Sequence, residues 1–167
     1  MGRLFGTDGV RGVANHDLTC ELAMKLGRAA AAVLINKSNR HPRVIIGKDT
    51  RLSSDMLENA MAAGLCSVGA SVVLLGVVPT PAVAYLVEKY KADAGVMISA
   101  SHNSYEYNGI KIFSGDGYKL PDELEEQIET IVLDREKTPR LSGGTDIGKV
   151  ETRPSAVKDY VDHLKST

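Results

Sequence analysis

Four polar side chains in this sequence are of types that could act together in a reaction. Ser101 and His102 are adjacent, Lys111 stands nine positions later, and Arg11 lies in a glycine-rich stretch near the N-terminus. A serine hydroxyl is a poor nucleophile by itself and needs a base or a cation beside it. An imidazole, an ammonium and a guanidinium could provide this help, so Ser101 is the candidate reactive group.

Three kinds of chemistry fit a Ser-His-Asn sequence. The first is a hydrolase triad, which is disfavoured because adjacent strand positions point in opposite directions and no G-x-S-x-G elbow is present. In the second, His102 and Asn103 only form a loop by bonding to backbone groups. In the third, Ser101 carries a phosphoryl group held by Arg11, Lys111 and backbone amides. The local sequence leaves the last two open.

The elements around Ser101 predict that it lies at the edge of a sheet. A short apolar run, 96–98, is typical of a buried strand and ends directly before the loop 99–103. A second apolar run, 110–113, predicts the next strand and carries Lys111. Residues 114–117 predict a hairpin turn, because their single carboxylate is too few for a magnesium-binding loop. Loops at strand ends in α/β proteins commonly carry the chemistry.

The rest of the chain alternates between predicted strands and helices. We expect three successive strand-helix units, which imply right-handed crossovers and helices on both faces of the sheet. The predicted fold class is α/β, a three-layer α/β/α sandwich with a mixed, mostly parallel sheet. Expected strands are 44–46, 71–75, 94–98 and 109–113, and expected helices are 19–35 with Thr19 as N-cap, one capped by Ser53 or Ser54, one from Thr80-Pro81 and one from Pro121.

Two loops could bind an anion. Residues 3–13 contain several glycines and predict a bent edge hairpin with exposed amides, in which Arg11 is either a phosphate donor or an ordinary solvated arginine. The loop charges Lys48, Asp49 and Arg51 could also bind an anion, but pairing with one another is favoured because loop ion pairs are common.

Composition excludes several classes of partner. The 167 residues carry 20 Lys and Arg against 21 Asp and Glu, with both signs interspersed, so we expect neither nucleic acid nor a membrane surface as a partner. The N-terminal residues lack the apolar run of a signal peptide. Cys20 and Cys66 match no metal or redox spacing, which predicts two reduced thiols and a cytoplasmic protein.

The C-terminal part predicts a second unit. Helical periodicity ends after residue 134, and Pro, Gly, Ser and Thr accumulate over 135–154, which predicts a linker or a long surface excursion. Residues 155–164 predict an amphipathic helix with Val157, Val161 and Leu164 on one side. We expect a domain at 1–134, a linker at 135–154 and the first helix of a truncated second domain at 155–167.

Three separated stretches resemble the N-terminal domain of the α-D-phosphohexomutase family. They are FGTDGVRG (5–12), GKDTRLS (47–53), and ISASHNSYEYNGIKIF (98–113) followed by DGYKLPDE (116–123). The resemblance covers residues 3–133, and its motifs are in the style of the members that act on glucosamine phosphates. Members acting on glucose or mannose phosphates are the nearest alternative. A non-catalytic anion-binding module that keeps the scaffold is the alternative of another class.

The resemblance implies specific roles. Ser101 would be a phosphoserine that donates its phosphoryl group to a hexosamine phosphate and recovers one from the bisphosphate intermediate. Mg²⁺ would bridge the Ser101 phosphate and aspartates of a domain outside these residues. Lys111 and Arg11 correspond to the basic residues beside the phosphoserine; Lys111 is the better candidate for proton transfer because an ammonium can lose its proton, whereas a guanidinium effectively cannot. His102 would position groups or exchange protons.

Two departures from the family pattern bear on these roles. Ser104 stands where the family usually has proline, which loosens the backbone of the loop. The family's aspartate-rich metal loop, sugar-selecting loop and C-terminal phosphate-binding loop lie in three later domains, so the partners would include the remaining domains of the same protein. We therefore expect this chain to fold but not to convert sugar phosphate by itself.

Overall fold

A single mixed sheet forms the centre of the molecule. The computed structural model describes residues 4–38, 41–134 and 137–167. The strand order is β1-β5-β4-β2-β3-β6, in which β4, β2, β3 and β6 run parallel and β5 is antiparallel to both of its neighbours. The strands are β1 (Val10–Val13), β2 (Arg43–Lys48), β3 (Ser71–Val77), β4 (Ala94–Ile98), β5 (Tyr107–Ser114) and β6 (Val150–Thr152).

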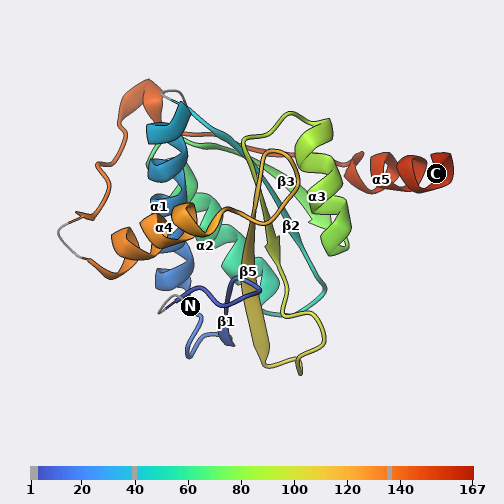
Figure 1. Ribbon diagram of the computed structural model, residues 1–167, viewed down its shortest axis with the longest axis horizontal. Coiled ribbons are helices and arrows are strands. Elements are labelled where there is room, and N and C mark those ends of the chain that lie inside the picture. The colour runs from blue at the N-terminus through green and yellow to red at the C-terminus, as the bar shows by residue number, and fades with distance from the viewer. Residues whose placement is uncertain (1–3, 39–40, 135–136) are drawn as a thin grey trace.

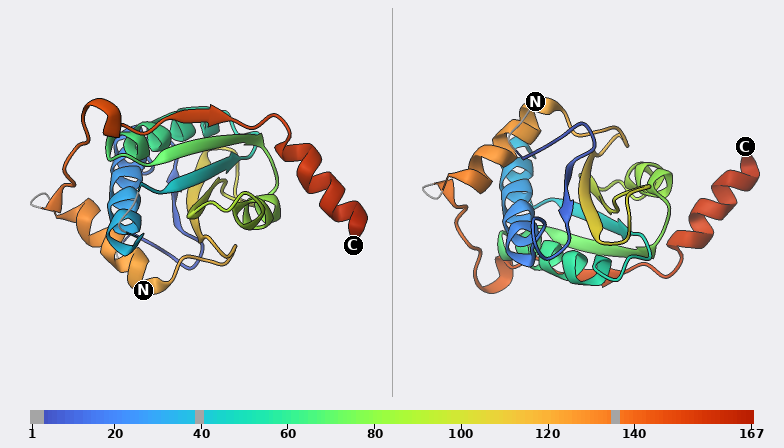
Figure 2. Two further views of the ribbon diagram at one scale, coloured as in Figure 1. Left: turned by 90° about the horizontal axis from the view of Figure 1, so that it is seen from above. Right: turned by 90° about the horizontal axis from the view of Figure 1, so that it is seen from below.

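Helices cover both faces of this sheet. Helices α1 and α2 pack on one face with α4 against α1, and α3 lies on the other face (Figures 1 and 2). The predicted three-layer α/β/α sandwich with a mixed, mostly parallel sheet is confirmed. The helices are α1 (Cys20–Ser38), α2 (Ser54–Ser67), α3 (Thr80–Lys89), α4 (Asp122–Leu133) and α5 (Ala156–Ser166), with a 3₁₀ turn at Gly144–Asp146.

Helices α1 and α2 approach each other closely because glycines face each other at their crossing. A Cβ on Gly27 would lie 2.5 Å from the carbonyl oxygen of Met61, and one on Gly64 would lie 2.2 Å from that of Met24. Neither position has room for a side chain, so the two backbones pack directly on one another. The N-terminus of α1 is capped as predicted, since the hydroxyl of Thr19 accepts the Leu22 N–H at 3.2 Å.

The N-terminal segment forms a tight turn and then an edge strand. Gly6 N–H donates to the Gly9 carbonyl at 3.0 Å, and β1 pairs antiparallel with β5. The predicted edge hairpin is therefore confirmed over the part that can be compared; residue 3 of the predicted range 3–13 lies outside the described residues.

The region predicted as a linker contains a strand that the sequence pattern did not reveal. Residues 150–152 form β6, which adds to the sheet beside β3, and α5 follows as predicted. Residues 135 and 136 of that region lie outside the described part of the chain. Among the helices in the described ranges, none combines the length and apolar character that a membrane span requires.

Candidate functional site

Ser101 lies where the sequence predicted it, just beyond the carboxyl end of β4. Strand β4 ends at Ile98, Ser99 and Ala100 are buried, and Ser101 is exposed. Its φ of 57° falls in the left-handed region, which a non-glycine residue occupies only where surrounding contacts hold it. The hydroxyl therefore stands in solvent on a backbone whose conformation is imposed by its neighbours.

The Ser99 side chain lies between the Ser101 backbone and the partly buried carboxylate of Asp49, which is 24% exposed. The Ser101 N–H donates to the Ser99 hydroxyl oxygen at 3.0 Å, and the interaction with Ser99 is one of those that lower the pKa of Asp49. Asp49 also accepts the Ser54 hydroxyl at 2.9 Å and the Arg51 N–H at 3.0 Å. Burial raises the pKa of Asp49, but these hydrogen bonds lower it more, so its pKa lies below the ordinary value of 3.8.

The Arg51 guanidinium binds the backbone of the Ser101 loop and also pairs with Asp49. Nη1 donates to the carbonyl oxygens of Ser104 and Tyr107 at 2.5 and 3.0 Å. Nη2 donates to those of Ser101 and Asn103 at 3.1 and 2.8 Å. Nε donates to Asp49 at 3.0 Å, and the side chain is only 11% exposed. These contacts use all five donors of a guanidinium.

The predicted pairing within the loop 48–51 is correct for two of its three charges. Asp49 and Arg51 pair with each other, whereas Lys48 instead pairs with Asp55 and Glu58 of α2. The sequence did not predict the four contacts between Arg51 and backbone carbonyls. Every residue has a backbone carbonyl, so residue types cannot show which carbonyls a side chain will bind. The only signal in the sequence was that GKDTR follows a predicted strand.

Arg11 reaches the same loop from β1. Because Arg11 pairs with Gly109 of β5, its side chain lies on the α3 face of the sheet, close to the start of the loop. Nη1 donates to Asn103 Oδ1 at 2.9 Å and Nη2 to Asp8 Oδ2 at 3.3 Å. These two contacts leave donors of the guanidinium unused among the described residues, and the side chain is 24% exposed.

His102 and Lys111 stand differently with respect to Ser101. His102 is exposed, and its Nδ1 lies 3.4 Å from the Ser101 hydroxyl oxygen, too long for a strong hydrogen bond. Lys111 is on β5 opposite Met97, on the same sheet face as Arg11. Within the described residues no hydrogen bond or ion pair joins Lys111 to Ser101. Lys111 instead lines a cavity of about 220 Å³ together with Thr7, Asp8 and Thr80.

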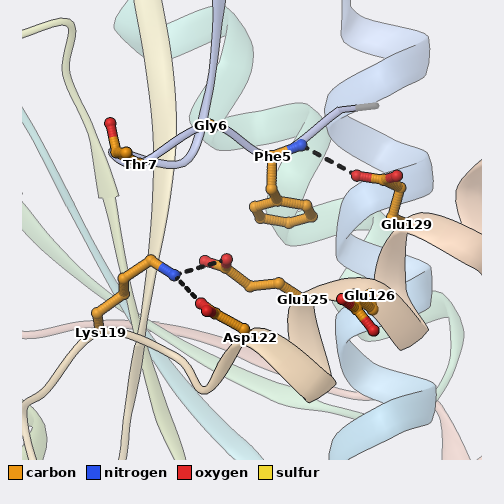
Figure 3. Close-up of a pocket in the computed structure, with 8 residues that line it drawn as sticks. All are labelled: Phe5, Gly6, Thr7, Lys119, Asp122, Glu125, Glu126 and Glu129. Carbon is orange, nitrogen blue, oxygen red and sulfur yellow. Dashed lines mark hydrogen bonds and ion pairs between the residues drawn. The ribbon is translucent and has the colours of Figure 1, made fainter. Parts of the chain in front are cut away.

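Beside a neighbouring pocket, contacts with α4 hold the N-terminal segment that leads to Arg11 (Figure 3). The Glu129 carboxylate on α4 accepts the N–H groups of Leu4 and Phe5 at 2.8 and 3.1 Å. Below that segment, Lys119 pairs with Asp122 at 2.6 Å and Glu125 at 2.8 Å. Helix α4 thereby anchors the turn before β1, and the Lys119 ammonium is already held by two carboxylates.

The described part of the chain offers little to a metal ion. The described ranges contain no group of three or more His, Cys, Asp or Glu side chains that could hold one. Near Ser101, Asp8 is exposed but pairs with Arg11, and Asp49 is taken up by its hydrogen bonds. A phosphate on Ser101 would itself supply oxygen ligands of the kind Mg²⁺ prefers.

Comparison with known proteins identifies the family. Residues 2–139 match the description "Phosphoglucomutase/phosphomannomutase, alpha/beta/alpha domain I". The chain belongs to the phosphoglucomutase/phosphomannomutase family. The resemblance to the α-D-phosphohexomutases noted in the sequence is thus confirmed.

Curated relatives within the family share one name. A protein of Acetivibrio thermocellus named phosphoglucosamine mutase is 59% identical over 167 residues, covering all of this chain and 37% of that protein. Another of the same name from Thermoanaerobacter sp. (strain X514) has the same identity and coverage. The chain therefore spans little more than a third of the length of these relatives.

Solved structures of the family have the same fold. A protein from Thermus thermophilus, described as a phosphomannomutase, superposes with a TM-score of 0.82 at 32% identity, covering 97% of this chain and 35% of that one. A phosphoglucomutase/phosphomannomutase family protein from Burkholderia thailandensis gives 0.76 at 25% identity, covering 96% and 35%. Both agree with the fold class predicted from the sequence.

Proposed function

We propose that this chain is the phosphoserine domain of a phosphoglucosamine mutase, which interconverts glucosamine 6-phosphate and glucosamine 1-phosphate, and that Ser101 carries the phosphoryl group. The observation that supports this most strongly is the surrounding of Ser101. Its hydroxyl is exposed, its backbone is held by Ser99 and Arg51, and Arg11 reaches the same loop with donors to spare. The name shared by the relatives at 59% identity supports the choice of sugar.

The proposed reaction has two balanced transfers. In the first, the bond between phosphorus and the Ser101 oxygen breaks and that oxygen takes up a proton, while a bond forms from phosphorus to a free hydroxyl of the hexosamine phosphate, whose proton passes to a base. In the second, the bisphosphate turns over and the bond between its other phosphorus and the sugar oxygen breaks. That phosphorus bonds to the Ser101 oxygen, whose proton passes to a base, and the freed sugar oxygen takes up a proton. In-line placement and neutralisation of charge on the equatorial oxygens are what such a transfer demands.

The basic residues receive distinct roles in this proposal. Arg11 binds the phosphoryl oxygens through its unused donors, because a guanidinium is a fixed-charge fork that suits phosphate. Lys111 is the candidate for proton transfer, and it would act from the neighbouring cavity once a sugar phosphate lies between it and Ser101. His102 is assigned positioning or proton exchange, since its ring nitrogen already lies near the Ser101 oxygen.

Magnesium enters the proposal through the Ser101 phosphate. Of this chain's residues, Ser101 in its phosphorylated form would contact the ion, and carboxylates from another part of the longer protein would complete the site. The ion, when bound, neutralises charge on the transferring group. Arg11 would still orient the phosphate by direct hydrogen bonds.

We further propose the division into a domain at 1–134, a linker at 135–154 that pairs with β3 as the edge strand β6, and the first helix of a second domain at 155–167. The apolar side of α5 supports it: Val157, Val161 and Leu164 are 51%, 38% and 53% exposed. The partners would then be a hexosamine phosphate and the rest of the same polypeptide, and the chain alone would be inactive. The cytoplasmic location expected from the sequence stays a prediction.

Mass analysis of the freshly purified full-length protein tests the assignment. We expect a species heavier by one phosphoryl group, mapped to Ser101 and absent from Ser101→Ala. Ser104→Ala is the matched control, because Ser104 is an exposed serine of the same loop. Phosphate that persists in Ser101→Ala, or that maps to another residue, would contradict the proposal. An unphosphorylated protein that binds phosphate without turnover would favour the non-catalytic module, and turnover of glucose or mannose phosphates in preference to glucosamine phosphates would favour the alternative substrates.

A further inference from the structure

Arg51 is largely buried, with 11% of its side chain exposed, and its donors are directed at Asp49 and at the backbone of the Ser101 loop. Its five donors are all engaged: one by Asp49 and four by the carbonyl oxygens of residues 101, 103, 104 and 107. A guanidinium with no free donor cannot also bind a phosphate. Its charge is further offset by Asp49, at 3.0 Å. Arg51 therefore differs from Arg11, whose contacts leave donors unused.

The four carbonyls that Arg51 binds belong to the loop that must hold Ser101 in a left-handed conformation. One of them is the carbonyl of Ser101 itself, and another is that of Ser104, where the family usually has a proline. Within the loop, short backbone contacts run from the Asn103 N–H to Ala100 and from the Tyr107 N–H to Ser104, at 3.1 Å each. The guanidinium thus adds four backbone contacts to a loop that is otherwise held by these two bonds, by the Ser99 hydroxyl and by Arg11.

We propose that Arg51 is a positioning residue that fixes the Ser101 oxygen for phosphoryl transfer, with Asp49 orienting its guanidinium. This inference rests on the proposed function of Ser101. A displacement of about 1 Å in a reacting atom can cost on the order of a hundredfold in rate. Loss of the four carbonyl contacts would let Ser101 relax to a negative φ and move its oxygen, while the fold beneath the loop stays intact.

The variant that isolates this role is Arg51→Lys. Lysine keeps the positive charge but has one nitrogen with three donors, which cannot reach carbonyls arranged around two separate nitrogen atoms. Arg28→Lys is the matched control: Arg28 lies on α1 and its Nε donates to Ser67 at 3.1 Å, away from the loop. Both substitutions remove a guanidinium and preserve the net charge.

Hydrogen exchange in the full-length protein gives the first test. In Arg51→Lys we expect the amides of Asn103 and Tyr107 to exchange at least about tenfold faster, because the carbonyl contacts that order the loop are lost. Amides of β4 should keep their wild-type rates, as should the whole of Arg28→Lys. Exchange at residues 103 and 107 within about twofold of wild type would overturn the proposal.

Kinetics separates positioning from a loss of stability. With Ser101 phosphorylated, we expect Arg51→Lys to transfer the phosphoryl group to glucosamine 6-phosphate at least about tenfold more slowly, with KM and the unfolding midpoint unchanged. Added guanidinium ion should restore part of the rate in Arg51→Ala and should leave the rate of Arg28→Ala unchanged. An unchanged kcat, or a loss confined to KM, would overturn the positioning role.

The two tests also separate this inference from the proposed function. If wild-type Ser101 carries no phosphoryl group, the proposed function fails, while the exchange rates still decide whether Arg51 orders the loop. If Arg51→Lys does not fold, Asp49→Asn replaces it, because that change removes the charged partner of Nε and leaves the arginine in place. We then expect faster exchange at residues 103 and 107 by the same criterion.

Discussion

Replacing Asn108 with alanine should loosen the support beneath the Ser101 loop. Asn108 is fully buried in β5, opposite Gly12 of β1. Its side-chain nitrogen donates to the hydroxyl oxygens of Ser53 and Ser54 at 2.9 and 3.1 Å, and its side-chain oxygen accepts the Gly109 N–H at 2.8 Å. One side chain therefore ties β5 to the first residues of α2.

The expected cost follows from these three hydrogen bonds. The Gly109 N–H is buried and would lose its side-chain acceptor, which costs about 1–3 kcal/mol. The two serine hydroxyls lose a donor but can still donate elsewhere, as Ser54 does to Asp49, so together they add about 1 kcal/mol. We expect the free energy of unfolding to fall by about 2–4 kcal/mol. For a domain of this size the melting temperature should fall by roughly 4–16 °C.

Urea denaturation of the purified protein measures this change. The midpoint should fall in Asn108→Ala with an unchanged slope, because the surface exposed on unfolding stays the same. Asn59→Ala is the control, since Asn59 is exposed and donates only to the Asp55 carbonyl; it should stay within about 0.5 kcal/mol of wild type. A loss below about 1 kcal/mol in Asn108→Ala would show that the buried amide does not tie these elements together.

Three further perturbations test other contacts of the site. Lys48→Met leaves the Glu58 carboxylate, which is 5% exposed, without its cation, so the free energy of unfolding should fall by about 3–5 kcal/mol. Adding Glu58→Leu should recover more than half of that loss. A double variant no more stable than Lys48→Met would argue against a buried ion pair. Gly109→Ala should destabilise the fold by about 1–3 kcal/mol, because the added Cβ would lie 2.7 Å from a carbonyl oxygen of the neighbouring chain segment. In the control Gly143→Ala the added Cβ meets no atom within 4 Å, so its stability should equal that of wild type. Equal melting temperatures for the two variants would refute the predicted clash at Gly109. The pKa of Asp49 is lower in the folded protein than its value of 3.8 in the unfolded chain, so the ionised carboxylate stabilises the fold above pH 3.8, and this stabilisation is lost as the pH falls through the pKa of the folded state. The difference in unfolding free energy between wild type and Asp49→Asn should therefore shrink from about pH 5 to about pH 2. A difference that stays constant with pH would contradict the assignment.

Most of the layered fold could be predicted because its signals are local. The β-branched run 44–46 lies inside β2, Thr19 caps α1, and the strand 94–98 matches β4. Each of these depends on periodicity or on a capping side chain, which a sequence displays directly. The family resemblance added the candidate roles of the site residues.

The features that the sequence did not reveal depend on partners far along the chain. Strand β6 has three exposed residues and exists only because β3 offers a free edge to pair with. Ser53 was predicted as a possible cap, but its side chain makes no capping bond and instead accepts from Asn108. Arg51 was treated as one charge of a loop pair, because its backbone acceptors 50 or more positions away cannot be identified from residue types.

The most direct test follows the phosphoryl group itself. Phosphorylated full-length protein is mixed with one equivalent of glucosamine 6-phosphate, quenched at short times, and the peptide containing Ser101 is weighed. We predict that the phosphoryl group leaves Ser101 as glucosamine 1,6-bisphosphate forms, in equal amounts, and that it then returns to Ser101 as the bisphosphate disappears. Formation of glucosamine 1-phosphate while Ser101 keeps its original phosphoryl group, or never carries one, would contradict the account.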